Sequence, residues 1–504
     1  QTYHNTEATP INVVYVFPLN ATTTVHGFTV TTPTCTLTAS VMEKADARAA
    51  FDAAVAAGSG AYLVEESTPD VFTTTVGNLP PNAVVEVRLS LVMELAGGDN
   101  VTRLLLPVAL GPRFAFRAAP TTTPTPVADG PRGMRITATF QTSVAIEEVS
   151  PVGGGEATVA LADSGTGATV TVGNLNTGLT SDFVVELRTA PRPTATCLAE
   201  LPAVAGGPVA VMTTVDCKPD KPLPTPPMEW EFVVDRSGSM RISGRMAAAI
   251  AALQLCLRSL PAGSRFNITS FGTSTASLFP DGCRPYDDAT LAAATKHVAA
   301  MTPNLGGTNI LTPIQAITRR RTAAGFQRVV MLFTDGCVRD ESAVFTSVKA
   351  LYNTTRTRCF AMGVGSGVST SLVGGVARAG SGTAEFVVEG QAMDEPCIRQ
   401  MQAGLAPAVK GATVDWGTLQ NSLLFGAPHK DVTVTLGQPV TLWAMFAPTA
   451  SDAPPTAVTV NVTLESGDRL AFSTPVTVAG GANNVVHGTA LHSLTARRRI
   501  TELE

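Results

Sequence analysis

The stretch that decides the fold is EWEFVVDRSGSM, residues 229–240. Its first six residues are mostly apolar or aromatic and predict a buried strand. Asp235, Ser237 and Ser239 follow directly, and a helical pattern then covers 243–259. The loop between a strand's carboxyl end and the next helix is where open α/β sheets bind ligands. The stretch therefore predicts both an α/β fold and a polar site.

The sequence around this stretch alternates between strand and helix patterns from residue 228 to about 406. Such alternation is typical of a parallel sheet with helices on both faces, so we expect a doubly wound, Rossmann-like α/β domain over 228–406. The expected strands are 229–234, 265–271, 328–334, 358–364 and 384–388. The expected helices are 243–259, 287–301, 310–322, 341–352, 369–378 and 394–405.

The rest of the chain is rich in strand patterns, which Pro-rich stretches divide. Residues 1–118 alternate in strand fashion, with one helix expected from Glu43 to Ala57, and a Pro/Thr-rich boundary follows at 119–130. KPDKPLPTPP, residues 218–227, cannot continue a helix or a central strand and marks a second boundary. The remaining expected segments are a β-rich region at 131–217, a second one at 411–480 with strands at 431–436, 440–446, 457–464 and 469–478, and a C-terminal helix at 485–504.

Length and composition limit the classes to which this chain can belong. Its 504 residues are several times the size of one domain, so three or four domains are expected. Charged residues make up 15% and the net charge is −5, without a basic cluster suited to nucleic acid. No apolar run is long enough to span a bilayer. The chain starts at Gln1 and stops inside a helical pattern, which is typical of a fragment or a processed form; the compartment stays open, with an intracellular location favoured.

The eight cysteines give no sign of a metal cluster or a disulfide scaffold, because none of them forms a C-x-x-C pair. Cys256 and Cys359 lie in apolar segments and are expected to be buried thiols. Cys197 and Cys217 flank a Pro-rich stretch and would pair only in an oxidising compartment, which the sequence does not decide.

Two further loops add oxygen ligands to those of residues 235–239. Gly306-Gly307-Thr308-Asn309 precedes an expected helix, and the strand 328–334 ends in Asp335-Gly336. A D-x-S-x-S pattern alone is weak evidence, because Asp and Ser also occur as ordinary helix caps. Short oxygen ligands from three separate loops, however, suit a hard divalent cation such as Mg²⁺, with Mn²⁺ or Ca²⁺ as alternatives.

The expected metal residues are Asp235, Ser237, Ser239, Thr308 and Asp335. The three hydroxyls are expected to coordinate the cation directly, and the two carboxylates to act through water or as hydrogen-bond acceptors around it. One coordination position is then left for an oxygen from outside the chain, which predicts capture of a Glu or Asp carboxylate on a protein partner. No residue near the site supplies a base or a redox group, so catalysis is not expected.

Two sets of motifs resemble known families. The segments DRSGSM (235–240), LGGTN (305–309) and FTDG (333–336) resemble the metal-ion-dependent adhesion site of the von Willebrand factor type A domain. The segments YVFPL (15–19), AYLVE (61–65), VGNLP (76–80) and LP (106–107) resemble the VIT domain, named for vault protein inter-alpha-trypsin. The combination implies the group that contains inter-alpha-trypsin inhibitor heavy chains, the vault-associated ADP-ribosyltransferase and intracellular type A proteins, and Arg236 is most similar to the intracellular members.

The resemblance also implies how the domains are joined and what they do. In the heavy chains the type A domain is inserted in a β-sandwich, so 131–217 and 411–480 are expected to be the two halves of one sandwich. The favoured function is a non-enzymatic protein-binding module; the alternative is a scaffold or targeting segment of a larger enzyme, with a structural metal. The chain has neither an ADP-ribosyltransferase-like segment nor the heavy chains' Asp-Pro-His-Phe motif, and it lacks P-loop and serine-hydrolase motifs.

Overall fold

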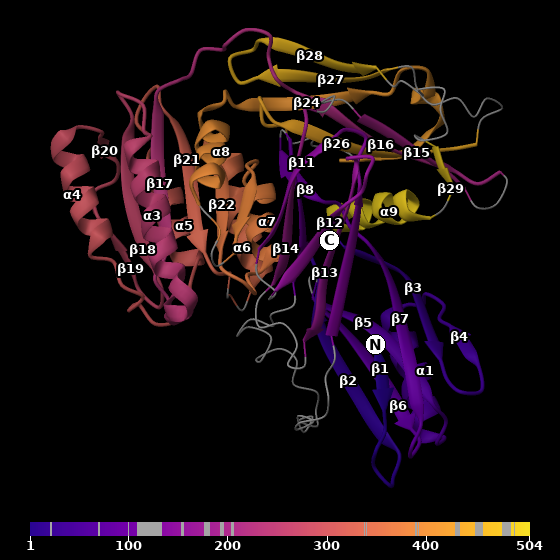
Figure 1. Ribbon diagram of the computed structural model, residues 1–504. Helices are drawn as coiled ribbons and strands as arrows, with labels where there is room; N and C mark the ends of the chain where they lie inside the picture. Colours follow the sequence, from indigo (N-terminus) through magenta and orange to yellow (C-terminus); the bar gives the residue numbers. More distant parts are fainter. Residues whose placement is uncertain are drawn as a thin grey trace.

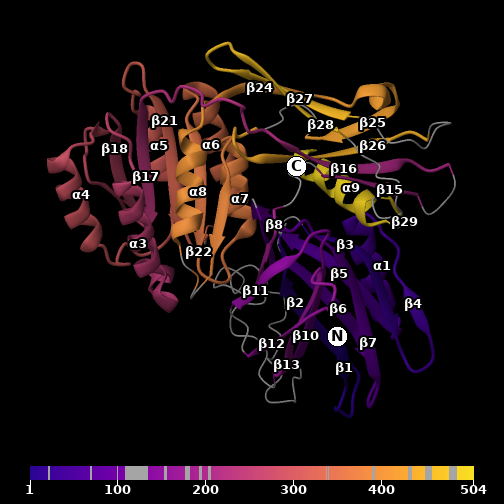
Figure 2. The same ribbon diagram turned by 45° about the horizontal axis from the view of Figure 1, so that its top comes forward.

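Figure 1 shows the computed structural model of the chain, which describes all residues except 21–22, 69–70, 99, 108–133, 153–155, 176–181, 192–195, 203–205, 337, 339, 389–390, 392, 429–433, 449–456, 476–484, 488 and 504. The described residues form one α/β domain and several β-rich regions, which Figure 2 shows from a second direction. The expected boundary at 119–130 lies outside the described residues. Within the described part, the helices are too short or too polar to cross a membrane.

Five parallel strands form the centre of the α/β domain, in the order β18-β17-β21-β22-β23. They agree with the expected strands to within one residue at each end. Two short strands add to the β18 side through antiparallel pairing. The bounds are β17 Met228–Asp235, β18 Arg265–Phe271, β19 Thr275–Ser277, β20 Arg284–Pro285, β21 Gln327–Thr334, β22 Arg358–Val364 and β23 Ala384–Val387.

Helices pack on both faces of this sheet. One face forms a core with α3, α4 and α8, and the other with α5, α6 and α7. The helix expected from residue 243 begins at Arg245, because residues 238–244 form the 3-10 helix η1 and Gly244 has a left-handed φ of 76°. The bounds are η1 Gly238–Gly244, α3 Arg245–Arg258, α4 Asp288–Ala299, α5 Leu311–Arg319, α6 Glu341–Thr355, α7 Thr370–Ala379 and α8 Asp394–Leu405.

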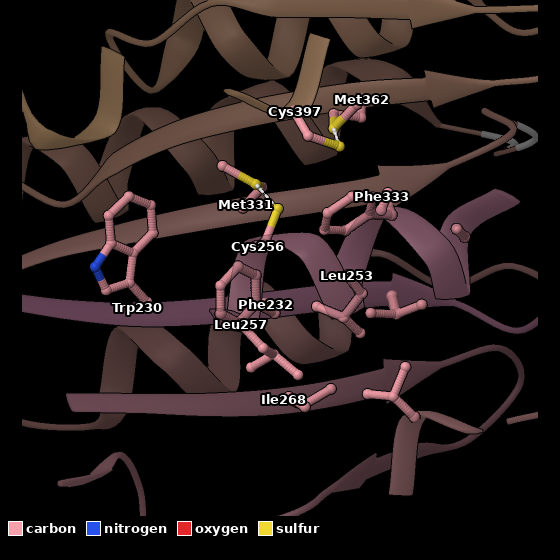
Figure 3. Close-up of a cluster of buried hydrophobic side chains, with 14 of the residues drawn as sticks. Trp230, Phe232, Leu253, Cys256, Leu257, Ile268, Met331, Phe333, Met362 and Cys397 are labelled. Atoms are coloured by element: carbon pink, nitrogen blue, oxygen red, sulfur yellow. Dashed lines mark hydrogen bonds between the residues drawn. The ribbon is translucent and has the colours of Figure 1, made fainter. Parts of the chain in front are cut away.

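The central strand β17 is buried along its whole length. Trp230 and Phe232 point to the same side of the sheet, where they meet Leu253 and Leu257 of α3 (Figure 3). Aromatic rings of this size stabilise a core by several kcal/mol each when fully buried. This packing fixes the position of β17 and therefore of the loop at its carboxyl end.

Two glutamates on the opposite face of β17 are also buried, and each is paired with an arginine. Glu229 accepts a hydrogen bond of 2.7 Å from Arg328 Nε on the neighbouring strand, with both side chains at most 4% exposed. Glu231 pairs with Arg320 at 3.1 Å. Burying a charge is tolerated only when it is paired and hydrogen-bonded, so these pairs explain how an acidic, alternating strand can lie at the centre of a sheet.

Two sheets and one helix form the N-terminal β-rich region. The sheets have the strand orders β1-β7-β3-β4 and β2-β6-β5, and they share a core that includes Val30, Val76 and Val85. Helix α1 (Lys44–Ala56) lies against β6, where Phe51 and Val55 approach Gly77. The bounds are β1 Thr2–His4, β2 Ile11–Pro18, β3 Thr24–Thr31, β4 Thr36–Thr38, β5 Ala61–Thr68, β6 Val71–Leu79 and β7 Val84–Val92.

The second β-rich region corrects the expected domain boundary at residue 118. Strand β9 pairs with β14 in the four-stranded sheet β11-β14-β9-β8, so residues 96–106 belong with the flanking region rather than with the N-terminal one. The Pro/Thr-rich composition after residue 118 did not indicate this boundary, because side-chain packing between strands determines which strands pair. The bounds are β8 Ala96–Gly98, β9 Val101–Leu106, β10 Met134–Gln141, β11 Ile146–Val152, β12 Ala157–Leu161, β13 Gly167–Leu175 and β14 Phe183–Thr189.

The third β-rich region combines strands from both sides of the α/β domain. Strand β16 pairs with β26 along its whole length, within the sheet β25-β26-β16-β15-β29. This sheet shares a core with the sheet β24-β27-β28. Residues 434–436 are not in a strand, and the rest of the strand expected at 431–436 lies outside the described residues. The bounds are β15 Thr196–Leu201, β16 Val209–Asp216, β24 Val409–Asp415, β25 Leu423–Ala427, β26 Pro439–Phe446, β27 Ala457–Leu464, β28 Arg469–Pro475 and β29 Val485–His487.

The C-terminal helix begins later than expected. Residues 485–487 form β29, which pairs in parallel with β15, and helix α9 then runs over Ala490–Leu503. The buried Glu200 accepts hydrogen bonds from the backbone N–H groups of Ala490 and His492, each at 2.9 Å. These donors lie at the start of α9 and have no partner within the helix. The helix packs against the third β-rich region through Leu491 and Leu494.

The cysteines that the structure describes are free thiols, including Cys197 and Cys217, for which the sequence left pairing open. Burial raises the pKa of Cys197 to about 11 and that of Cys217 to about 12. Both thiols are therefore protonated and unreactive near neutral pH.

Candidate metal centre

The predicted metal residues lie at the ends of two neighbouring strands and in one adjacent loop. Asp235 is the last residue of β17, and Asp335 directly follows β21. These strands are parallel and adjacent, so their carboxyl ends meet at one edge of the sheet. Ser237 is the N-cap of η1, and Ser239 lies in the first turn of η1.

Asp235 is fully buried, and both of its carboxylate oxygens accept hydrogen bonds. Its Oδ1 accepts from the backbone N–H of Ser237 at 2.8 Å, and its Oδ2 accepts from the Thr334 hydroxyl at 2.7 Å. The carboxylate therefore joins the end of β17 to its own loop and to the end of β21. This arrangement suits a residue that orients the ligands around a cation.

The two serine hydroxyls of the motif point toward each other. Ser237 Oγ and Ser239 Oγ lie 3.0 Å apart, with Ser237 buried and Ser239 half-buried. Each hydroxyl oxygen has two lone pairs, and only one of the two needs to donate within the pair. Both oxygens thus keep lone pairs with which a cation could be coordinated.

Backbone hydrogen bonds hold the loop that contains Thr308 against the serine loop. Gly238 N–H donates to the Gly306 carbonyl at 2.7 Å, and Leu305 N–H donates to the Arg236 carbonyl at 2.9 Å. The same loop is fixed from its other side, because Asn309 N–H donates to the Gly272 carbonyl at 3.1 Å. The half-buried Thr308 therefore lies in a loop bound directly to residues 236–238.

Asp335 differs from Asp235 in having one oxygen without a partner. Its Oδ2 accepts from Arg245 Nη1 at 3.2 Å, and the side chain is fully buried. Its Oδ1 is also buried and has no well-aligned hydrogen-bond partner among the described residues. A buried acceptor without a partner destabilises the folded state by about 1–3 kcal/mol, and by more when it is charged. A ligand that contacts this oxygen would remove that cost.

The two carboxylates disfavour each other's charged form. Burial raises the pKa of Asp235, and the nearby charge of Asp335 raises it further. Burial also raises the pKa of Asp335, against the opposing effects of Ser239 and Arg245. Two desolvated carboxylates are stabilised by added positive charge, which is what a divalent cation provides.

This set of donors fits a hard divalent cation. Within the described parts of the chain, no three His, Cys, Asp or Glu side chains gather in a way that would hold a metal, so a site here must use hydroxyl oxygens. Two carboxylates with Ser and Thr hydroxyls are all-oxygen donors, as Mg²⁺ prefers. The chemistry that these donors support directly is the binding of a hard cation.

The sequence did not identify Arg245 or Thr334 as part of this site. Arg245 is the first residue of a helix that is otherwise mainly apolar, and its side chain is only 7% exposed. A lone arginine at such a position was the available signal. Thr334 had no comparable signal, because threonine is ordinary at the end of a buried strand.

Two known domain families match parts of the chain, and several known proteins are similar to it in sequence. The vault protein inter-alpha-trypsin domain matches residues 1–91, and the von Willebrand factor type A domain matches residues 231–386. The von Willebrand factor A domain-containing protein 5A of Homo sapiens is 33% identical over 441 residues, which cover 82% of this chain and 55% of that protein. The chain spans about half the length of the curated relatives it matches.

Solved structures resemble parts of the chain at low identity. A von Willebrand factor type A protein from Catenulispora acidiphila is 15% identical, with a TM-score of 0.39, over 59% of this chain and 77% of that one. The proximal thread matrix protein 1 from the mussel byssus, solved with zinc at its adhesion-site motif, is 18% identical, with a TM-score of 0.31, over 38% of this chain and 47% of that one.

Proposed function

The chain is a VIT and von Willebrand factor type A domain protein, and from that premise we propose that it is a binding module that captures an acidic residue of a protein partner through a divalent cation. Domains of the type A family generally mediate protein–protein interaction, and neither matched family is a catalytic one. The cation, most simply Mg²⁺, is held by Ser237, Ser239 and Thr308, with Asp235 and Asp335 around it. The partner's Glu or Asp carboxylate takes the remaining position.

The observation that carries this proposal is the buried Oδ1 of Asp335, which no well-aligned hydrogen bond from the described residues satisfies. It lies in a site that already contains a second buried carboxylate and two hydroxyls 3.0 Å apart. A purely structural cluster would be expected to satisfy its own acceptors. A cation, directly or through a bound water, satisfies Oδ1 and offsets the repulsion between the carboxylates.

The proposal extends to the architecture around the site. We take the parallel sheet with helices on both faces as the doubly wound fold of type A domains. We take the two sheets that share the core around Val211 and Val460 as one sandwich, built from both sides of the α/β domain. On this reading the β-rich regions present the metal site, while the second candidate function, a targeting segment of a larger enzyme, leaves the metal with a structural role only.

Magnesium is expected to raise the melting temperature of the wild-type chain relative to a sample in chelator. A ligand at 100 times its dissociation constant stabilises the folded state by about 2.7 kcal/mol. The double variant Asp235→Ala/Thr308→Ala should lose this shift, because it removes a carboxylate and a direct ligand. Differential scanning calorimetry in magnesium and in chelator measures both.

The matched control is Asp163→Ala/Thr158→Ala, which removes the same two residue types from exposed positions in the second β-rich region. This control should keep the full magnesium shift. The proposal is wrong if the wild-type chain shows no shift, or if the shift survives in Asp235→Ala/Thr308→Ala.

A further inference from the structure

Arg245 is a buried cation that contacts the candidate metal centre from the side of α3. Its Nη1 donates to Asp335 Oδ2 at 3.2 Å, and its Nη2 donates to the backbone carbonyl of Ser366. Its side chain crosses Gly365, where a Cβ atom would lie 2.8 Å from Arg245 Cδ. Gly365 thus leaves room for this arginine, and Asp335 and the Ser366 carbonyl are among the acceptors of its guanidinium.

The loop that receives Arg245 is itself fixed by a neighbouring region. Gly367 N–H donates at 3.0 Å to Oδ2 of Asp182, a buried residue just before β14. The Ser366 carbonyl is one residue away from this contact. The guanidinium of Arg245 therefore contacts the end of β21 through Asp335 and, through Ser366, a loop that packs against the second β-rich region.

The position of Arg245 changes the charge of the site. The Arg245 guanidinium offsets part of the negative charge that Asp235 and Asp335 carry when both are ionised. With a divalent cation bound as well, Arg245 adds to the positive charge that meets a carboxylate from outside the chain.

We propose that Arg245 is a built-in counter-ion that makes cation binding and carboxylate capture depend on each other. This inference rests on the proposed function and adds its regulation. Arg245 repels a divalent cation and so weakens binding of the cation alone, while it leaves positive charge for an acidic ligand to neutralise. In the absence of any cation, Arg245 stabilises the fold by offsetting the charge of Asp335.

Arg245→Gln tests the charge, because glutamine removes the positive charge and keeps a polar side chain at this position. A unit charge a few ångströms from a cation changes its affinity by at least about tenfold, even at a high effective dielectric constant. We expect Arg245→Gln to bind Mg²⁺ at least about tenfold more tightly than the wild type in isothermal titration. We also expect it to melt at a lower temperature in chelator.

Acetate serves as the carboxylate probe, with chloride at the same ionic strength as its control. In the wild-type chain acetate should increase the affinity for Mg²⁺, and in Arg245→Gln this increase should be lost. Arg245→Lys keeps the charge and should keep the acetate effect. The matched control is Arg241→Gln, since Arg241 is exposed in η1 and donates to the Pro303 carbonyl; it should behave as the wild type.

The outcomes separate this inference from the proposed function. If the wild type does not bind Mg²⁺, both are overturned. If the wild type binds Mg²⁺ and Arg245→Gln binds it equally or more weakly, the inference alone is overturned. If Arg245→Gln does not fold, as judged by circular dichroism, Arg245→Lys decides: a folded lysine variant without the acetate effect overturns the counter-ion role.

Discussion

Gly272→Ala is expected to abolish the magnesium-dependent rise in melting temperature and to destabilise the α/β domain. A Cβ atom on residue 272 would press on Leu305 Cβ and lie only 2.5 Å from the Leu305 carbonyl oxygen. Because the second of these is backbone, no side-chain rotation relieves the contact. Leu305, in the loop that contains Thr308, would have to move away from Gly272. This movement disturbs the backbone hydrogen bonds of the loop to Arg236 and Gly238.

The expected cost has two parts. Forced repacking typically costs about 1–3 kcal/mol, and loss of the cation site removes up to about 2.7 kcal/mol of ligand-dependent stability. Gly307→Ala is the matched control in the same loop, since its nearest neighbour would be Thr273 Oγ1 at 3.4 Å. Calorimetry with and without magnesium measures both variants. A full magnesium shift in Gly272→Ala would show that the Thr308 loop does not contribute to the site.

Arg328→Met is expected to lower the free energy of unfolding by about 3–5 kcal/mol, because the buried Glu229 carboxylate loses its direct partner at 2.7 Å and keeps the longer contact, at 3.9 Å, to Arg265. Arg328 Nε donates to Glu229 at 2.7 Å, and its Nη1 donates to the carbonyls of Ile317 and Arg320. The variant therefore places an apolar side chain beside Glu229 and removes the hydrogen bonds to the two carbonyls at the end of α5. Denaturant unfolding measures the change.

A second arginine–glutamate pair in the same domain provides the control. Arg399 Nε donates to Glu385 at 2.8 Å, but both side chains are partly exposed, at 33% and 23%. Exposed pairs contribute about 0.2–1 kcal/mol, so Arg399→Met should have a small effect. Equal losses for Arg328→Met and Arg399→Met would contradict the role assigned to the buried pair.

The α/β strands could be predicted from the sequence because their signal is local. An apolar run followed by D-x-S-x-S identifies both β17 and its loop, and the predicted strand ends differ from the structure by at most one residue. The predicted resemblance to VIT and type A domains is confirmed by the family matches at 1–91 and 231–386. Which residues bind a metal stays a prediction.

The contacts between distant segments could not be predicted in the same way. The pairing of β9 with β14 and of β16 with β26 depends on side-chain complementarity across long stretches of chain, which periodicity does not report. The hydrogen bond between Arg245 and Asp335 joins residues from different elements, and the lone arginine in an apolar helix does not indicate its partner. The parallel pairing of residues 485–487 with β15 likewise joins segments far apart in the sequence, where a helix was expected.

The most direct measurement of the central claim is the position of a bound cation in crystals soaked with Mn²⁺, whose anomalous scattering distinguishes it from water. The account predicts an anomalous peak between the hydroxyl oxygens of Ser237, Ser239 and Thr308, on the side of the Asp335 carboxylate, and no such peak in Asp235→Ala/Thr308→Ala. A strong peak elsewhere on the chain, with none at these hydroxyls, would contradict it.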